Sequence, residues 1–367
     1  MRTVLLTIGT FAAMLTALHA QTDSDRVRAR EICRRGIAAV DEGNLEKGLD
    51  LIQQAAALDP GNPNYRYEQA YISVMKGEYA AAVTMMEPLI DDSAAQDVWY
   101  QLLGNCYDYQ GNPKKATETY SIGLKRFPNS GPLHLELGVM SLKEDSVAKA
   151  VRYWEQGIRH APRFASNYYR AAKAFCSGTE RLWGLLYGEI FMNLEPASKR
   201  ASEISKLLFD TYAAAITLHK DSLRVNLLER STIGAGDISK HMKQPYSLDA
   251  ITAVTMACAA GMHKRDGVTV QMTVERLHAI REKFIGIWFE RGLDTTHANV
   301  LHYYQKQLLD AGHFEAYDRY LFREADAEAF QAWYDAHEEA MKSWIVWMEG
   351  HSIPIDGQHY FSRLEER

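Results

Sequence analysis

The feature that most constrains how this chain folds is a period of 34 residues across its first half. Two series of small residues keep this spacing: Gly36, Ala70, Gly104 and Gly138, then Gly48, Ala82, Ala116, Ala150 and Gly184. A series of turn-forming residues shares it: Gly43, Gly77, Gly111 and Asp145. A series of prolines does so too, with Ala94 in place of one of them: Pro60, Pro128, Pro162 and Pro196. Independent series that stay in phase indicate a repeat architecture, in which each unit covers the apolar face of the next.

One unit, Asp97 to Ser130, has the pattern of a helical hairpin. Apolar or aromatic side chains recur on one face of its first helix, at Tyr100, Leu103 and Tyr107. The run Gly111-Asn112-Pro113 breaks that helix, and Pro128 ends a second one that carries Ala116, Tyr120 and Leu124. We expect Gly104 to let a second backbone come close, because glycine has no side chain.

These residues resemble the tetratricopeptide repeat. The family pattern is matched by Tyr100, Leu103, Gly104, Tyr107, Ala116, Tyr120 and Pro128, and in the next unit by Leu137, Gly138, Ala150, Trp154 and Pro162. The resemblance covers about residues 29–198. It implies an all-α solenoid of about five helical hairpins, whose first helices line a concave face that binds a protein or peptide.

On the register of this family, certain positions of each first helix face the groove. The residues predicted to contact a partner there are Asn64, Tyr67, Tyr71, Gln101, Asn105, Asp108, Tyr169 and Lys173. The tyrosines offer rigid aromatic contact area, and the amides and the carboxylate can bond a peptide backbone. In the alternative interpretation, the C-terminal region folds back and buries these tyrosines.

From Lys199 onward the 34-residue period is lost, but helical periodicity continues. One apolar stripe runs from Ile204 to Ile216, and Leu248 to Ala260 is apolar almost all round, as in a buried helix. We expect a degenerate sixth hairpin over Asp294 to Arg323, and a last helix that Asp326 caps and Gly350 ends. The sequence thus predicts a repeat domain over residues 21–198 and a helical C-terminal domain over residues 199–367.

The first 20 residues read as a signal peptide. Arg2 precedes an apolar run from Val4 to Leu18, Ala20 supplies a small residue for cleavage, and a polar stretch follows at Gln21. The alternative is a buried or membrane-anchoring N-terminal helix. Since no later run approaches 18 apolar residues, we predict no integral membrane segment after cleavage. The expected location is periplasmic or secreted.

Charge and cysteine content narrow the function further. Lys and Arg number 41 against 47 for Asp and Glu, so the chain offers no electrostatic basis for binding nucleic acid. Its four cysteines, Cys33, Cys106, Cys176 and Cys258, lack a C-x-x-C spacing. The first three belong to helices two repeats apart, beyond the reach of a disulfide. We expect buried thiols.

The sequence contains no catalytic constellation, and we predict no cofactor and no metal. Ten of the 13 histidines follow residue 198, but no two are three or four residues apart, the spacing that a shared helix face requires. His351, Asp356 and His359 are the one group near the C-terminus that could converge. The predicted function is a non-enzymatic scaffold for a protein or peptide of unknown identity. The alternatives are a hydrolase or metal enzyme using these histidines and the irregular segment Ser231 to Ser247, and a purely architectural role.

Overall fold

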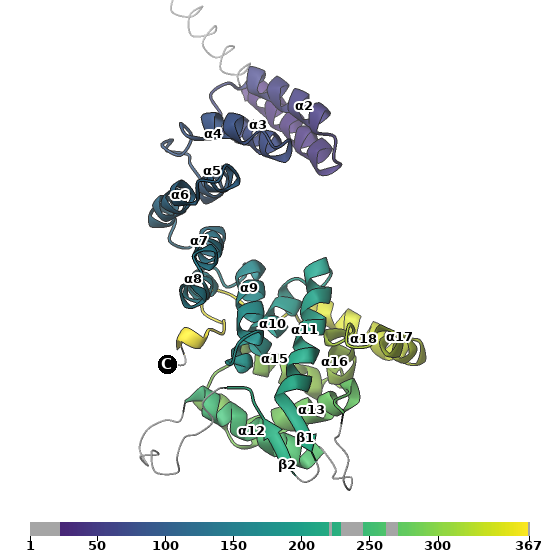
Figure 1. Cartoon of the computed structure of the whole chain (residues 1–367). Coiled ribbons are helices and arrows are strands. Elements are labelled where there is room, and N and C mark those ends of the chain that lie inside the picture. Colours follow the sequence, from purple (N-terminus) through teal and green to yellow (C-terminus); the bar gives the residue numbers. More distant parts are fainter. Residues whose placement is uncertain (1–22, 220–221, 229–244, 262–270, 366–367) are drawn as a thin grey trace, which may run out of the picture. The chain divides into compact units, whose positions relative to one another are not determined.

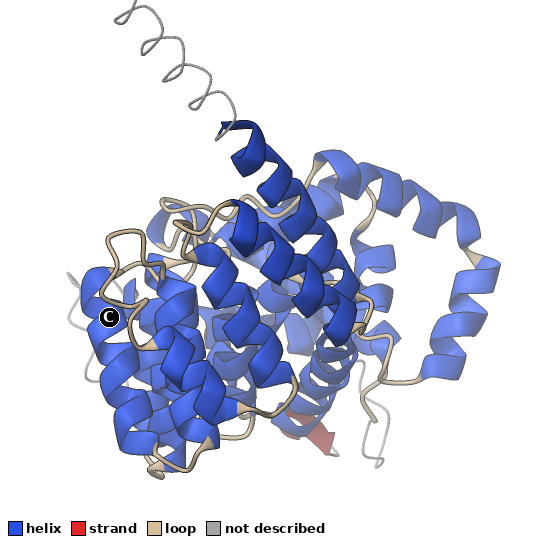
Figure 2. Ribbon diagram, turned by 90° about the horizontal axis from the view of Figure 1, so that it is seen from above, coloured by secondary structure: helices blue, strands red, loops and turns tan. Residues whose placement is uncertain are grey.

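The computed structural model describes residues 23–219, 222–228, 245–261 and 271–365 (Figure 1). The predicted signal peptide and most of the segment Ser231 to Ser247 lie outside these ranges. The chain divides into two compact units, residues 1–128 and 129–367. This division differs from the domain boundary expected at residue 198, which stays a prediction about where the repeat pattern ends. Helix dominates the described residues, as predicted, and they contain one pair of short strands (Figure 2).

The first unit consists of consecutive antiparallel helix pairs. Residues 23–41 are helical, and the helices that follow are α2 (Leu45–Leu58), α3 (Asn64–Met75), α4 (Tyr79–Met86), α5 (Asp97–Tyr109) and α6 (Pro113–Arg126). Each helix contacts its neighbours along the chain.

The second unit begins with the same kind of pairs and ends in an irregular helical region. Its elements are α7 (Gly131–Lys143), α8 (Val147–His160), α9 (Ala165–Cys176), α10 (Arg181–Leu194), α11 (Lys199–Ala215), β1 (Ile216–His219), β2 (Ser222–Val225), α12 (Tyr246–Gly261), α13 (Val274–Glu290), α14 (Leu293–Thr296), α15 (Val300–Asp310), α16 (Phe314–Leu321), α17 (Ala327–Ala336), α18 (Glu338–Gly350) and η1 (Arg363–Glu365). Antiparallel β1 and β2 pair Ile216 with Val225.

The helix boundaries follow the sequence period closely. The helices α2, α4, α6, α8 and α10 each begin 34 residues after the previous one, and so do α5, α7, α9 and α11. The expectation that the period is lost at Lys199 is therefore wrong for α11, which begins in register. The series of small residues does not reveal that α11 continues the period, because Lys206 occupies the position where earlier units have glycine or alanine. The predicted helical stripe from Ile204 is confirmed as far as Ala215, where α11 ends, and only its last residue, Ile216, belongs to β1.

A residue in the left-handed backbone region closes the turn inside four of the hairpins. The φ angles are +84° at Gly43, +79° at Gly77, +75° at Gly111 and +55° at Asp145. Aspartate is among the few residue types that adopt this region without large strain. Gly312, with φ of +73°, repeats the turn between α15 and α16. The sixth hairpin expected within Asp294 to Arg323 is thereby confirmed.

The small residues of the first helices make room for aromatic rings. A Cβ atom at Gly104 would lie 2.1 Å from the Tyr120 ring, and one at Gly138 would lie 2.1 Å from the Trp154 ring. Both rings are fully buried. The predicted close approach at Gly104 is confirmed, but the approaching group is a side chain of the second helix and not its backbone.

The C-terminal region shares one apolar core with the last repeat hairpins, from Ala150 to Phe361. After α18 the chain passes along α8, where the guanidinium of Arg363 forms a two-bond ion pair with Glu155 at 2.8 and 2.9 Å. The single last helix expected after Asp326 is in fact two helices. The helix is interrupted at His337, whose backbone angles of φ −131° and ψ 34° are not helical. The His337 ring stacks on Trp333 of α17. The predicted Asp326 cap is confirmed by a bond from the Ala329 amide.

All four cysteines are buried free thiols, as expected. Among the described helices, none is both long enough and apolar enough to cross a bilayer.

Candidate binding surface

The residues predicted to line the groove are divided between the two units. Six lie in the first unit, on α3 and α5: Asn64, Tyr67, Tyr71, Gln101, Asn105 and Asp108. Tyr169 and Lys173 lie on α9 in the second unit. Each group is therefore a separate candidate surface.

In the first unit, α3 presents an exposed apolar strip. Tyr67 and Tyr71 are four residues apart and share a helix face, which Met75 extends by one more turn. Tyr71 is 41% exposed and Met75 is 47% exposed. The half-buried Tyr67 ring stacks on Trp99 of α5, with 6.2 Å between ring centroids. Tyr67 is thus held in place, while Tyr71 and Met75 remain open to solvent. Sequence reasoning missed Met75, although its spacing from Tyr71 places it on the same face.

Some of the polar residues of this surface already form hydrogen bonds within the first unit. The side-chain oxygen Oδ1 of Asn64 accepts a hydrogen bond from Gln96 at 3.3 Å, and Oδ1 of Asn105 accepts one from the Tyr120 hydroxyl at 2.6 Å. Gln101, Asn105 and Asp108 are all half-buried on α5. Asn105 therefore has a structural role, because it anchors the ring that fills the space beside Gly104.

Carboxylates make this surface acidic. Burial raises the pKa of Glu68 above its ordinary value, and the nearby charge of Asp41 raises it further. The pKa of Tyr67 is raised to about 12, mainly by burial. The nearby groups Glu68, Tyr71 and Asp97 add smaller contributions in the same direction. Neither Glu68 nor Asp41 forms an ion pair within the described residues. An exposed apolar strip beside uncompensated negative charge favours a partner with basic and apolar groups.

In the second unit, α11 packs beside α9, as α5 packs beside α3, but its side chains engage the predicted groove residues. Tyr169 is only 8% exposed, and its hydroxyl donates to Glu203 of α11. The Lys173 ammonium also donates to Glu203, at 2.5 Å, and the guanidinium of Arg200 lies 5.1 Å from the Tyr169 ring. Tyr169 and Lys173 are therefore engaged within the fold.

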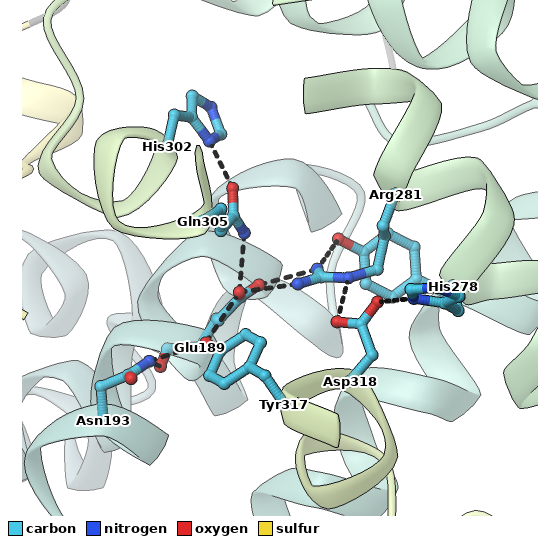
Figure 3. Close-up of polar contacts among 9 residues, drawn as sticks. Glu189, Asn193, His278, Arg281, His302, Gln305, Tyr317 and Asp318 are labelled. Carbon is cyan, nitrogen blue, oxygen red and sulfur yellow. Dashed lines mark hydrogen bonds and ion pairs between the residues drawn. The ribbon is translucent and has the colours of Figure 1, made fainter. Parts of the chain in front are cut away.

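The second unit also contains a buried ionic network that no sequence pattern indicated (Figure 3). Arg281 of α13 bonds both oxygens of Glu189 on α10, at 2.7 and 2.8 Å. Its Nε donates to Asp318 of α16 at 2.9 Å, and Asp318 also bonds His278 at 2.9 Å. Glu189 and Asp318 are 2% and 0% exposed.

Neutral groups complete the network. The Gln305 amide and the Tyr317 hydroxyl both donate to Glu189, at 2.7 and 2.9 Å. Burial alone would raise the pKa of Glu189, but the charge and hydrogen bonds of Arg281 hold it below its ordinary value. Burial lowers the pKa of His302 to about 4, so that this ring, which bonds Gln305, is neutral.

The network is suited to holding helices together and not to contacting a partner. Its charged side chains are paired with one another and almost inaccessible to solvent. They come from α10, α13 and α16, and Gln305 links α15 to them through a hydrogen bond. The adjoining cavity has a volume of about 40 Å³, which suits water and not a substrate. Sequence reasoning missed this network because Glu189 and Arg281 are 92 residues apart.

The histidines of the C-terminal tail do not converge as the sequence allowed. His359 bonds Asp356 at 3.0 Å, whereas His351 stacks on Trp347 with 4.3 Å between centroids and bonds its carbonyl. Within the described ranges, no group of three His, Cys, Asp or Glu residues is placed to hold a metal ion.

Sequence comparison bears directly on the helical hairpins of the first unit. Residues 33–87 match the family model of the tetratricopeptide repeat. The chain contains tetratricopeptide repeats. The match begins within the first helix, residues 23–41, reaches the end of α4 and includes Tyr67, Tyr71 and Met75. No curated protein sequence matches the chain.

Several solved TPR structures are similar to part of the chain. A thermophilic TPR protein of Thermus thermophilus is 18% identical, with 49% of this chain and 98% of that one covered and a TM-score of 0.43. Pseudomonas aeruginosa pilF is 17% identical, with 52% and 85% covered and a TM-score of 0.44. YrrB, described as a TPR protein with an unusual peptide-binding site, is 18% identical, with 48% and 90% covered and a TM-score of 0.33.

Proposed function

We propose that this chain is an exported, non-enzymatic scaffold that holds a protein or peptide segment on the α3–α5 surface of its first TPR unit. The observation that supports this most is the exposure of Tyr71 and Met75 beside a Tyr67 ring that Trp99 already holds. Large apolar side chains exposed together on a rigid face are typical of interaction sites.

The charge of this surface narrows the class of partner. Glu68 is half-buried, its pKa is raised, and Asp41 adds like charge beside it. A basic group of the partner would relieve this repulsion while an apolar side chain covers Tyr71. The proposed partner is therefore a segment that carries Lys or Arg next to an aliphatic or aromatic residue. Its binding should weaken as salt increases.

Crosslinking and pull-down of the mature chain, residues 21–367, from its native envelope would identify the partner segment. Calorimetry with that segment would then compare Tyr71→Ala combined with Met75→Ala against Ile122→Ala. Ile122 is a matched control, because it is 53% exposed on α6, a second helix of its hairpin. The double variant should weaken binding at least about tenfold, as expected for central anchors, and the control should not. Equal affinities for both variants would contradict the proposal.

Export is a separate part of the proposal, and it is motivated by residues 1–20. Mass spectrometry of the chain from fractionated cells should find a mature N-terminus at Gln21. Placing arginine at Leu5 and Leu6 should interrupt the apolar run and retain the uncleaved chain inside the cell. An uncleaved chain in the membrane fraction would favour the anchoring alternative.

A further inference from the structure

We propose that the C-terminal region binds a fatty-acid-like ligand, a single carboxylate on an apolar chain, in a pocket of the second unit. The pocket lies among α10, α15, α16, α17 and α18 and has a volume of about 540 Å³. Sites of this size commonly hold small ligands. The inference goes beyond the proposed peptide-binding function, because no residue of the α3–α5 surface takes part.

The wall of this pocket is apolar and adaptable. Three methionines line it, Met192 from α10 and Met341 and Met348 from α18. Unbranched thioether side chains adjust to ligands of different shape, and methionine-rich surfaces recur at sites that accept varied apolar groups. Such a wall suits a flexible acyl chain better than a rigid polar molecule.

The helix α17 covers one side of the pocket. Phe330 and Tyr334, one turn apart on this helix, both face the pocket, yet α17 contains no buried residue. Its packing therefore depends on a few partly buried aromatic side chains. An apolar ligand beneath Phe330 and Tyr334 would add contact area to a helix that has little of its own.

One charged side chain, Arg323, occurs among the described residues that line the pocket. Its guanidinium stacks 4.3 Å from the Tyr320 ring and donates through one terminal nitrogen to the Tyr320 carbonyl at 3.1 Å. The Glu324 carboxylate forms a long ion pair with Nε, at 3.7 Å, which is beyond hydrogen-bond range and leaves the terminal nitrogens free of it. The side chain is 15% exposed, so this cation is held in place with donors still available.

Three uncharged polar side chains of the lining, Asn193, Tyr317 and Tyr320, already have partners. The Asn193 amide donates to the Tyr317 hydroxyl at 2.8 Å, and the Tyr320 hydroxyl donates to the Pro196 carbonyl at 2.6 Å. Arg323 therefore decides the charge of the ligand. A carboxylate matches a single guanidinium in charge and in two-bond geometry. A phosphate monoester carries close to two charges at neutral pH, and its second charge would remain uncompensated in an apolar wall.

Four probes of equal chain length test the inference by calorimetry on the mature chain: octanoate, octanol, octylammonium and octyl phosphate. Octanoate should bind at least about tenfold more tightly than octanol, as expected for a charge-assisted bond, and octylammonium should bind least. Octyl phosphate should bind more weakly than octanoate. Equal affinity for all four, no binding of octanoate, or a preference for octyl phosphate would overturn the proposal.

Two variants locate the binding. Arg323→Met should abolish the preference for octanoate over octanol, whereas Arg224→Met, at an exposed position on β2, should leave it unchanged. Met348→Trp should fill the pocket and remove binding of every probe. Circular dichroism and thermal unfolding would establish that each variant is folded. A preference for octanoate that persists in Arg323→Met would refute the role of the guanidinium, whatever happens to peptide binding on α3 and α5.

Discussion

Tyr67 and Tyr169 occupy equivalent positions of the repeat in the two units, and they have different surroundings. Tyr67 is half-buried, packs on Trp99 and lies beside the exposed Tyr71. Tyr169 is 8% exposed, because Glu203 and Arg200 of α11 engage its hydroxyl and its ring. The repeat register therefore determines which face a side chain occupies, and the helix that packs next determines whether that face stays open.

The two units also differ in how they are stabilised. In the first unit, buried apolar residues follow one another along the hairpins, from the cluster that includes Ile52 and Ile72 to Trp99 and Tyr120, as expected where each hairpin contacts only its neighbours. In the second unit one core joins the last repeats to the C-terminal helices, and the Glu189–Arg281–Asp318 network lies within it. We expect two separable unfolding transitions. The variants below should affect one transition and not the other.

The largest effect should follow from Arg281→Met. This substitution leaves Glu189 and Asp318 buried without their cation, a change that commonly costs about 3–5 kcal/mol. Urea unfolding followed by circular dichroism should show the loss in the transition of the second unit. Lys206→Met, which removes an exposed ion pair with Asp210, is the control and should change little. Similar losses in the two variants would contradict a stabilising role for the network.

Acid should destabilise the second unit through His302. Its pKa is about 4 in the folded chain, below the ordinary 6.5, so the unfolded chain binds more protons between these values. The stability that comes from keeping His302 neutral is therefore fully present above pH 6.5 and is lost as the pH falls toward 4. At pH 5 the loss is about 2 kcal/mol.

The measurement is urea unfolding at pH 7 and at pH 5. His302→Gln should reduce the difference in the free energy of unfolding of the second unit between pH 7 and pH 5, even if it lowers stability at both pH values. The first unit provides an internal comparison, since residues 21–128 contain no histidine. A pH slope that His302→Gln leaves unchanged would assign the acid sensitivity to other groups.

A smaller effect is expected in the first unit from Gly104→Ala. The new Cβ would lie 2.1 Å from the Tyr120 ring, and overpacking of this kind costs about 1–3 kcal/mol. Gly61→Ala is the control, because a Cβ there has no neighbour within 4 Å. Thermal unfolding should show a lower midpoint for Gly104→Ala alone, in the first transition. A shift of the second transition would mean that the units are not separable.

The smallest effect should come from Glu203→Gln. It weakens the contacts of α11 with Tyr169 and Lys173. Because the Lys173 and Glu203 side chains are 40% and 46% exposed, we expect a loss below about 1 kcal/mol. Accessibility of Tyr169 to a tyrosine-modifying reagent should rise, while that of Tyr71 should not change. Unchanged reactivity of Tyr169 would show that packing, and not Glu203, keeps this residue covered.

The hairpins and their boundaries could be predicted from the sequence because their signals act within a few residues. Gly43, Gly77 and Gly111 adopt the left-handed backbone that the turns need, and Asp145, of a type that tolerates this backbone, replaces glycine in the fourth hairpin. The register of the tetratricopeptide repeat placed Tyr67 and Tyr71 on the groove face, and both lie on one face of α3. The start of α11 kept the period even though its small residue was replaced by Lys206.

Other features depended on contacts between residues far apart in the chain. Glu189 meets Arg281 across 92 residues, and Arg363 meets Glu155 across 208. The period and the local signals of the sequence determined which segments form helices and how each hairpin turns. The tertiary structure alone decided which groove residues are engaged within the fold, which charges are buried and where the last helix divides. Burial and charge pairing depend on distance in space, and local sequence patterns carry no record of that distance.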